Sequence, residues 1–331
     1  MTRRSALLIL VMALGAVVIG LVLSVQEDQD PDAAAPTTTA VAVAPEAPAT
    51  TAEVTQTTIP PPAATAPACD PYRTVAVAGA LESVALVETS GIAASRTAPG
   101  VLWAHNDSGD DARLYAIGPS GEDLGALDVA GGLAFDWEDL AVGPGPDTTE
   151  SYLYVGDIGD NFGIRQGQVT VYLIREPDPA ALPESVPLDR VVVLASPDGA
   201  ADFEALFVAD GMIFIATKDK QLTSVYQSGP LIDGTTTSSL ELIATLDLGG
   251  EVTAADMSWD GTVIAFRGYQ AVWMWNRAPG TSVAEALATE PCTAPSPEER
   301  QGEALAFLAD GSFVTVSEGT DVVLHLIRRD P

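Results

Sequence analysis

The chain has 331 residues and a formal net charge of −31 at pH 7. A phosphate backbone repels so acidic a protein, which excludes nucleic acid as an expected partner. The two cysteines and two histidines lie too far apart in the sequence to form a zinc-binding pattern, and no phosphate-binding loop or nucleophile elbow is present.

The first 24 residues have the pattern of a membrane-targeting segment. Arg3 and Arg4 precede a nearly unbroken apolar run from Ala6 to Leu23. The run approaches the roughly 20 apolar residues that span a bilayer, and the flanking arginines favour a cytoplasmic N-terminus. We predict a single-pass signal anchor over residues 1–24 that holds an extracytoplasmic domain at the cell membrane. A cleaved signal peptide, which would leave the protein secreted, is the alternative.

Residues 25–68 are dominated by alanine, proline, threonine and valine. Such a segment buries too little apolar surface to offset the entropy lost on ordering, so we predict a disordered linker. Residues 69–331 are rich in valine, leucine, isoleucine and alanine, and they are numerous enough for one large globular domain.

One sequence unit recurs through this domain. Each copy contains an apolar run, a tight turn and a second apolar run, and the copies begin at residues 90, 138, 204, 255 and 303. Asp-Gly pairs at 210–211, 260–261 and 310–311 mark hairpins spaced by about 50 residues. Third and fourth apolar runs follow in most units, and four strands per unit are typical of β-propeller blades. We predict an all-β propeller with five blades; six remain possible because the second unit is long.

The last unit has three predicted strands, and the run from Thr74 to Leu81 can supply the fourth and close the ring. This closure brings Cys69 beside the last blade, whose first strand follows Cys292. We therefore predict a disulfide between them, as expected in an oxidising compartment, with free thiols or a metal site as alternatives. In the fourth unit, residues 282–289 fit a strand or a short helix. Residues 295–307 have helix-like spacing, but their phase in the repeat predicts a strand.

Three glutamates occupy the same position at the start of the first strand of their units: Glu138, Glu204 and Glu303, with Asp256 one residue away. First strands of propeller blades face the centre, so a ring of carboxylates is expected there. Clustered carboxylates raise one another's pKa unless a cation such as calcium neutralises them. The alternative is that the glutamates lock neighbouring blades together. If the domain is an enzyme, the three glutamates and His105 as base are the candidate catalytic residues.

Further polar residues lie at the ends of the second strands. Lys218 and Arg267 are candidate binding residues, because they could pair with the glutamates or with an anionic substrate; Asp256 and Trp137 join them as candidates near the channel mouth. The segment GDIGDN supplies three candidate calcium ligands, and Asp107 from the first unit is a fourth. These three are Asp157, Asp160 and Asn161. Turn chemistry alone also accounts for the Gly-Asp pairs.

The segment MSWDGTVIAFRGYQAVWMWN, which starts at Met257, resembles one repeat of the WD40-like surface propellers, although the Gly-His element of true WD40 repeats is absent. That resemblance implies a module that binds or scaffolds an extracytoplasmic protein or a small-molecule ligand. The segments HNDSGDDARLYAI and GDIGDN resemble parts of calcium-dependent propeller hydrolases, such as the propeller phytases and gluconolactonase-like enzymes. This second resemblance implies calcium-dependent hydrolysis of a phosphoester or lactone. Binding is the favoured expectation and hydrolysis the alternative.

Overall fold

The computed structural model describes residues 67–232 and 234–330. The predicted anchor and residues 25–66 of the predicted linker lie outside this part of the chain. Within the described ranges, no helix is long and apolar enough to cross a membrane.

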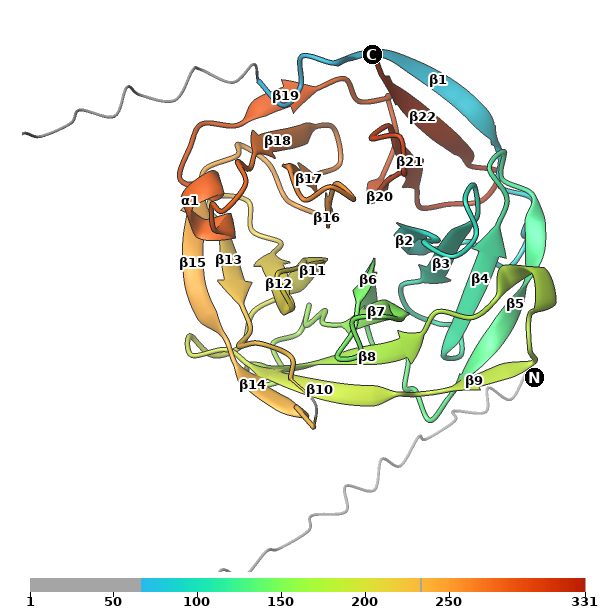
Figure 1. Ribbon diagram of the computed structural model, residues 1–331, viewed down its shortest axis with the longest axis horizontal. Helices are drawn as coiled ribbons and strands as arrows, with labels where there is room; N and C mark the ends of the chain where they lie inside the picture. The colour runs from blue at the N-terminus through green and yellow to red at the C-terminus, as the bar shows by residue number, and fades with distance from the viewer. Residues whose placement is uncertain (1–66, 233, 331) are drawn as a thin grey trace, which may run out of the picture. The chain divides into compact units, whose positions relative to one another are not determined.

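The described residues form five β-sheets arranged around a common centre, which confirms the five-bladed propeller (Figure 1). We number the blades I to V in the order of their innermost strands. These innermost strands are β2 (Thr89–Ala94), β6 (Trp137–Pro144), β11 (Phe203–Ala209), β16 (Ala254–Met257) and β20 (Gly302–Phe307).

Each blade continues outward through three further strands, with antiparallel pairing between successive neighbours. The second strands are β3 (Leu102–Asn106), β7 (Ser151–Asp157), β12 (Met212–Thr217), β17 (Val263–Arg267) and β21 (Phe313–Ser317). The third strands are β4 (Arg113–Ile117), β8 (Gln168–Arg175), β13 (Thr223–Gln227), β18 (Val272–Asn276) and β22 (Val323–Arg329). The fourth strands are β5 (Asp123–Ala130), β10 (Arg190–Ala195), β15 (Glu241–Leu246), β19 (Cys292–Ala294) and β1 (Tyr72–Ala80).

The ring closes as the sequence predicts, because β1 pairs with β22 and completes blade V. The predicted disulfide between Cys69 and Cys292 is present, with a Cα–Cα distance of 5.9 Å. Cys292 lies in β19, the outer strand of blade IV, and β20, the first strand of blade V, follows it in the sequence as predicted. The bond therefore joins the segment preceding β1 to the neighbouring blade.

Two short strands that the sequence analysis did not predict join neighbouring blades. The strand β9 (Ser185–Pro187) follows the 3₁₀ turn η1 (Pro179–Ala181) in blade II and pairs in parallel with β5 of blade I. Likewise β14 (Thr237–Ser239), from the β13–β15 connection of blade III, pairs in parallel with β10 of blade II. Both strands cover an exposed sheet edge and add contacts between blades.

The innermost strands are buried on both faces, because apolar side chains fill the space between adjacent sheets. Between blades III and IV, for example, Phe207 lies 6.0 Å from Phe266, measured between ring centroids. The short helix α1 (Val283–Leu287), with Ser282 as its N-cap, packs beside β15 and β18, so the helical alternative for this segment is confirmed. The strand predicted within residues 295–307 is β20.

Candidate functional site

The innermost strands of four blades share a local irregularity where they begin. The pairing register shifts between Trp137 and Asp139, between Phe203 and Ala205, between Gly302 and Ala304, and between Thr89 and Ile92. A β-bulge leaves a residue out of the ladder and re-aims its side chain. The residues inside three of these shifts are Glu138, Glu204 and Glu303. In blade IV, β16 pairs without a shift and carries Ala254 and Ala255 there.

The bulged residues lie around one cavity of about 70 Å³ at the centre of the ring, and we call this cavity the mouth. Six carboxylates line it: Glu88, Asp107, Glu138, Glu204, Glu303 and Glu318. The other lining residues are Thr89, Ser90, Asn161, Lys218 and Gln301, so Lys218 is the one basic side chain among them. The mouth is thus small, polar and strongly acidic.

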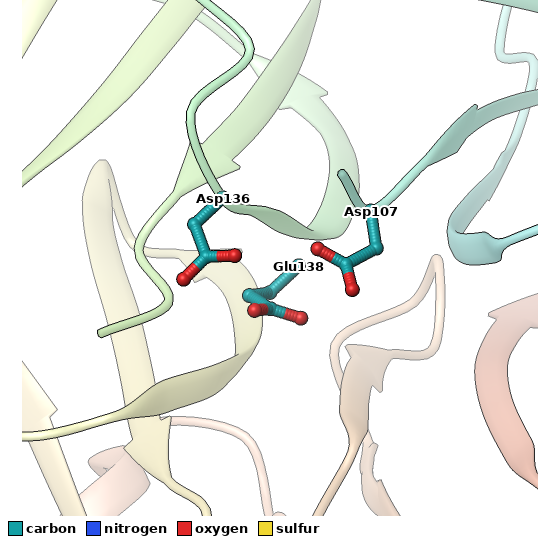
Figure 2. Close-up of side chains that lie close together, drawn as sticks. All are labelled: Asp107, Asp136 and Glu138. Atoms are coloured by element: carbon teal, nitrogen blue, oxygen red, sulfur yellow. The ribbon is translucent and has the colours of Figure 1, made fainter. Parts of the chain in front are cut away.

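Two groups of three carboxylates are close enough to share a cation. One contains Asp107, Asp136 and Glu138, whose side chains point toward one another (Figure 2). The other contains Glu138, Asp202 and Glu204, and in each group one oxygen per residue lies within 4.8 Å of the others. We call them the first and second carboxylate groups, and Glu138 belongs to both.

Asp136 and Asp202 were not predicted from the sequence. Each lies two residues before a bulged glutamate, and each is positioned by its backbone: Asp136 O accepts from Ile158 N at 3.1 Å, and Asp202 O accepts from Lys218 N at 2.9 Å. A signal was available, because the pattern Asp-aromatic-Glu occurs at residues 136–138 and again at 202–204.

Glu138 has an uncompensated oxygen at the centre of this arrangement. Its side chain is buried, and its Oε1 atom has no hydrogen-bond partner among the described residues. Gly159 closes one side of the first carboxylate group: a Cβ atom added there would lie 2.1 Å from Glu138 Oε1 and 2.6 Å from Asp136 Oδ2. The first carboxylate group is therefore closely packed on the side of Gly159, with Asp107 and Asp136 half-buried and one oxygen of Glu138 unpaired.

Burial makes these carboxylates hard to ionise. It raises the pKa of Asp107 to about 7, helped by the nearby charge of Asp136. Burial raises the pKa of Glu204 to about 8 and that of Glu303 to about 7, although Lys218 opposes both shifts. The pKa of Glu138 is raised well above its ordinary value by burial and then by Glu204. A bound cation would favour the ionised form of all four groups.

Lys218 already supplies a positive charge to the second carboxylate group. Its Nζ atom lies 2.9 Å from Glu204 Oε1 and 5.5 Å from the centroid of the Tyr269 ring. Burial works against the charge of Lys218, but its contacts with Glu204 raise its pKa overall. No ion pair joins a lysine or arginine to the first carboxylate group among the described residues. Arg165 and Lys218 lie near enough to oppose the rise that burial causes in the pKa values of its members, and the group is the better place for an added cation.

The predicted calcium loop is arranged differently from the prediction. Asp157 pairs with Arg165 and accepts from Asp136 N at 3.1 Å. Asp160 accepts from Ile164 N at 2.7 Å and from Arg165 N, so its carboxylate holds the turn that follows it. Of the four predicted ligands, Asn161 and Asp107 line the mouth, whereas Asp157 and Asp160 do not.

The predicted base is placed away from the mouth. His105 is fully buried, and its ring packs edge-on against Trp137 at 5.4 Å between centroids. Burial lowers the pKa of His105 to about 4, which keeps the imidazole neutral. Trp137 is buried as well and donates to Leu133 O at 2.9 Å, so both residues belong to the packing between blades I and II.

Arg267 and Asp256 are also absent from the mouth, which corrects their predicted placement. Arg267 is fully buried and pairs with Glu299, whose other oxygen lies 2.6 Å from Nδ1 of His325. Asp256 accepts from Met257 N at 2.7 Å and from Phe307 N at 2.8 Å, and it thereby joins blade IV to blade V. Both side chains hold the ring together.

A further buried carboxylate, which the sequence analysis did not single out, lies just below the mouth. Asp139 accepts from Leu206 N at 2.8 Å, from Ala255 N at 3.0 Å and from the amide of Leu140. It therefore connects blade II to blades III and IV across the centre. Blade locking by carboxylates, predicted as an alternative role for the three glutamates, is carried instead by Asp139 and Asp256.

Comparison with known proteins leaves the family open. No family model and no curated protein matches the sequence. Among solved structures, the chain is similar to a PQQ-bound aldose sugar dehydrogenase from Streptomyces coelicolor, with 13% identity, a TM-score of 0.46, and coverage of 77% of this chain and 98% of that one. It is also similar to a chain of the mitotic checkpoint complex, with 15% identity, a TM-score of 0.36, and coverage of 72% and 61% respectively.

Proposed function

We propose that the domain is a cation-dependent binding module in which a hard divalent cation, calcium foremost, is held by Asp107, Asp136 and Glu138. The observation that carries this proposal is the buried, unpartnered Oε1 atom of Glu138 within a group of three carboxylates. A buried charge is costly unless it is paired or coordinates a metal. Calcium takes about six to eight oxygen ligands, which the three carboxylates, Asn161 and water can provide.

The surroundings of the mouth favour a ligand that binds over it. Two adjacent loops, which also carry Asp136 and Asn161, expose four large apolar side chains. These are Leu133, Phe135, Phe162 and Ile164, with exposed fractions of 71%, 56%, 88% and 59%. Exposed apolar residues gathered beside a polar site are typical of interaction surfaces. We therefore assign the cation the role of shaping a surface for a protein or small-molecule ligand.

Thermal unfolding of the full chain tests cation binding. A cation that binds the folded state stabilises it by mass action, so millimolar calcium should raise the melting temperature relative to a chelator. The Glu138→Gln variant should lose this response. Equal melting temperatures with calcium and with chelator would contradict the proposal.

A metal-assisted hydrolase is the second candidate. It is favoured by one observation: the two carboxylate groups share Glu138, and Lys218 lies against the second. Adjacent cationic positions can hold a phosphoester and activate water. Turnover of p-nitrophenyl phosphate or of a simple lactone that requires calcium and is lost in Glu138→Gln would favour this candidate over binding alone.

We also propose that the domain works outside the cytoplasm, tethered by residues 1–24. Support comes from the arginine-flanked apolar run and from the disulfide, since such bonds persist mainly in oxidising compartments. In intact cells freed of any outer barrier, added protease should digest the domain while it remains in the membrane fraction. Protection from the protease would contradict the extracytoplasmic placement, and recovery in the soluble fraction would favour cleavage.

A further inference from the structure

The half of the mouth formed by blades V and I carries its own carboxylates, which the proposed cation site does not use. They are Glu88, just before β2, Glu303 on β20, and Glu318, just after β21. In the described part of the chain, no group of three ligands within 4.8 Å contains any of them. The three carboxylates therefore do not form a compact metal-ligand group of their own.

These residues include polar atoms that are buried and unsatisfied. The side chain of Glu303 is only 6% exposed, and its Oε2 atom has no partner among the described residues. Thr89 Oγ1, in another residue that lines the mouth, also has no hydrogen-bond partner among the described residues, and Thr89 is fully buried. Both atoms lack the hydrogen-bond partner that buried polar groups ordinarily have, and a donor that enters the mouth would supply one to Glu303.

An apolar groove of about 290 Å³ adjoins this half of the mouth. Residues 81–84, 86 and 87 line it on one side and Thr320, Asp321 and Val322 on the other, and the same two loops continue into Glu88 and Glu318. The loops are joined by a hydrogen bond from Gly319 N to Val87 O of 3.1 Å. Val84 is 93% exposed in the groove wall. The acidic pocket and the apolar groove thus share one pair of loops.

We propose that this half of the mouth and the groove together dock a segment of a partner protein, with a lysine side chain among Glu88, Glu303 and Glu318 and a neighbouring aliphatic side chain in the groove. An ammonium group offers three donors and no acceptor, which matches three separated carboxylates. Its flexible apolar stem can pass along Val87 toward the groove.

Charge complementarity excludes an acidic partner. Lys218 and one divalent cation would together offset half of the charge that the six lining carboxylates carry when all are ionised, and an entering ammonium group would favour their ionised form. An acidic segment would be repelled, whereas a basic one is attracted and steered.

Calorimetry with capped tripeptides tests the proposal on the calcium-saturated full chain. Leu-Lys-Leu should bind, Leu-Glu-Leu should not, and Gly-Lys-Gly should bind at least about threefold more weakly because it leaves the groove empty. Failure of Leu-Lys-Leu to bind at about 10 mM, or equal binding of all three peptides, would overturn the proposal. Equally tight binding of hexylamine would also overturn it, in favour of a small amine ligand.

Variants locate the site and separate this proposal from the cation site. Glu303→Gln should weaken Leu-Lys-Leu binding by at least about tenfold through loss of a charged partner, and it should leave calcium affinity within about twofold. Val84→Ser, a change at an exposed position, should weaken the binding of Leu-Lys-Leu and leave the calcium affinity unchanged. The control Glu184→Gln removes an exposed carboxylate on the far edge of blade I, and it should change neither the peptide affinity nor the calcium affinity. Calcium binding without peptide binding would refute the docking site only, and equal peptide binding by Glu303→Gln and Glu184→Gln would place the peptide elsewhere.

Discussion

Glu138 and Asp139 are neighbours on β6 and both are buried, but Asp139 accepts hydrogen bonds from the backbones of three strands whereas Glu138 keeps an oxygen without a partner among the described residues. The bulge between Trp137 and Asp139 separates the two roles, because it turns Glu138 into the mouth and leaves Asp139 beneath it. One carboxylate therefore stabilises the ring, and the other is available for binding.

Asp139→Ala should strongly destabilise the domain. The change leaves the amides of Leu206 and Ala255 buried without an acceptor, at an expected cost of about 2–4 kcal/mol in the free energy of unfolding. Denaturant unfolding measures this change in the free energy of unfolding. The matched change Glu138→Ala removes no hydrogen bond to a neighbouring blade and should cost clearly less in calcium-free buffer; an equal loss would contradict the division of roles.

Gly159→Ala should weaken calcium binding although every carboxylate is retained. The added methyl would lie 2.1 Å from Glu138 Oε1, so the carboxylates of the first group must move apart. We expect a loss in affinity of at least about tenfold, comparable to the loss of a metal-orienting contact. Gly250→Ala, outside the mouth, is the control for calcium binding, since Gly250 does not have a positive φ and a Cβ there would lie at an ordinary 3.5 Å from the Trp273 ring. An unchanged affinity in Gly159→Ala would place the cation elsewhere.

The calcium-free protein should lose stability as the pH rises from about 4 to about 8. The carboxyls of Asp107, Glu204 and Glu303 have pKa values of about 7, 8 and 7 in the folded state, above the values near 4 that they have when unfolded. In this window the folded state binds more protons than the unfolded state, so the free energy of unfolding falls with rising pH. Melting temperatures in a chelator should be higher at pH 5 than at pH 8.

Calcium should reverse this trend, because it replaces the protons and binds more tightly as the carboxyls ionise. The stabilisation by calcium should therefore be larger at pH 8 than at pH 5. A calcium effect that does not depend on pH would show that Asp107 and Glu138, whose pKa values burial raises, do not hold the ion.

Reduction of the Cys69–Cys292 bond should destabilise the closed ring. The two cysteines are separated by 223 residues, and the entropy of closing so long a loop in the unfolded chain corresponds to about 5 kcal/mol. Thermal unfolding with and without reductant measures the loss. The double variant Cys69→Ser, Cys292→Ser should match the reduced protein and be insensitive to reductant; a reductant effect that persists in it would have another cause.

The blades were predictable because local signals repeat in the sequence. The apolar alternation and the Asp-Gly turns fix the inner strands, and at Asp210 and Gly211 both residues adopt positive φ, 52° and 74°, as such a hairpin turn requires. The closing strand β1 could be predicted because the last unit has three strands of its own. The parallel strands β9 and β14 could not be, since three residues with no apolar pattern carry too little information.

The site was predictable in position but only partly in composition. Glu138, Glu204 and Glu303 occupy equivalent positions in the repeat, so their convergence follows from the symmetry of the ring. A register shift of one residue in β6 decides that Glu138 faces the mouth and that Asp139 accepts hydrogen bonds from neighbouring blades. Such a bulge leaves no clear pattern in the sequence. Asp157 was predicted to bind calcium but pairs with Arg165 instead. The sequence does not show this ion pair, because it depends on the path of the loop between the two residues.

Calcium calorimetry on the full chain at pH 7.5, with Glu138→Gln as the variant and Asp139→Asn as the buried neighbour, tests the cation site most directly. We predict one calcium ion bound by the wild-type protein, with protons released on binding, and an affinity at least about a hundredfold lower in Glu138→Gln. Asp139→Asn should bind calcium like the wild-type protein while it remains folded. Absence of binding at millimolar calcium, or equal affinity in the wild type and Glu138→Gln, would contradict the assignment of the mouth as a cation site.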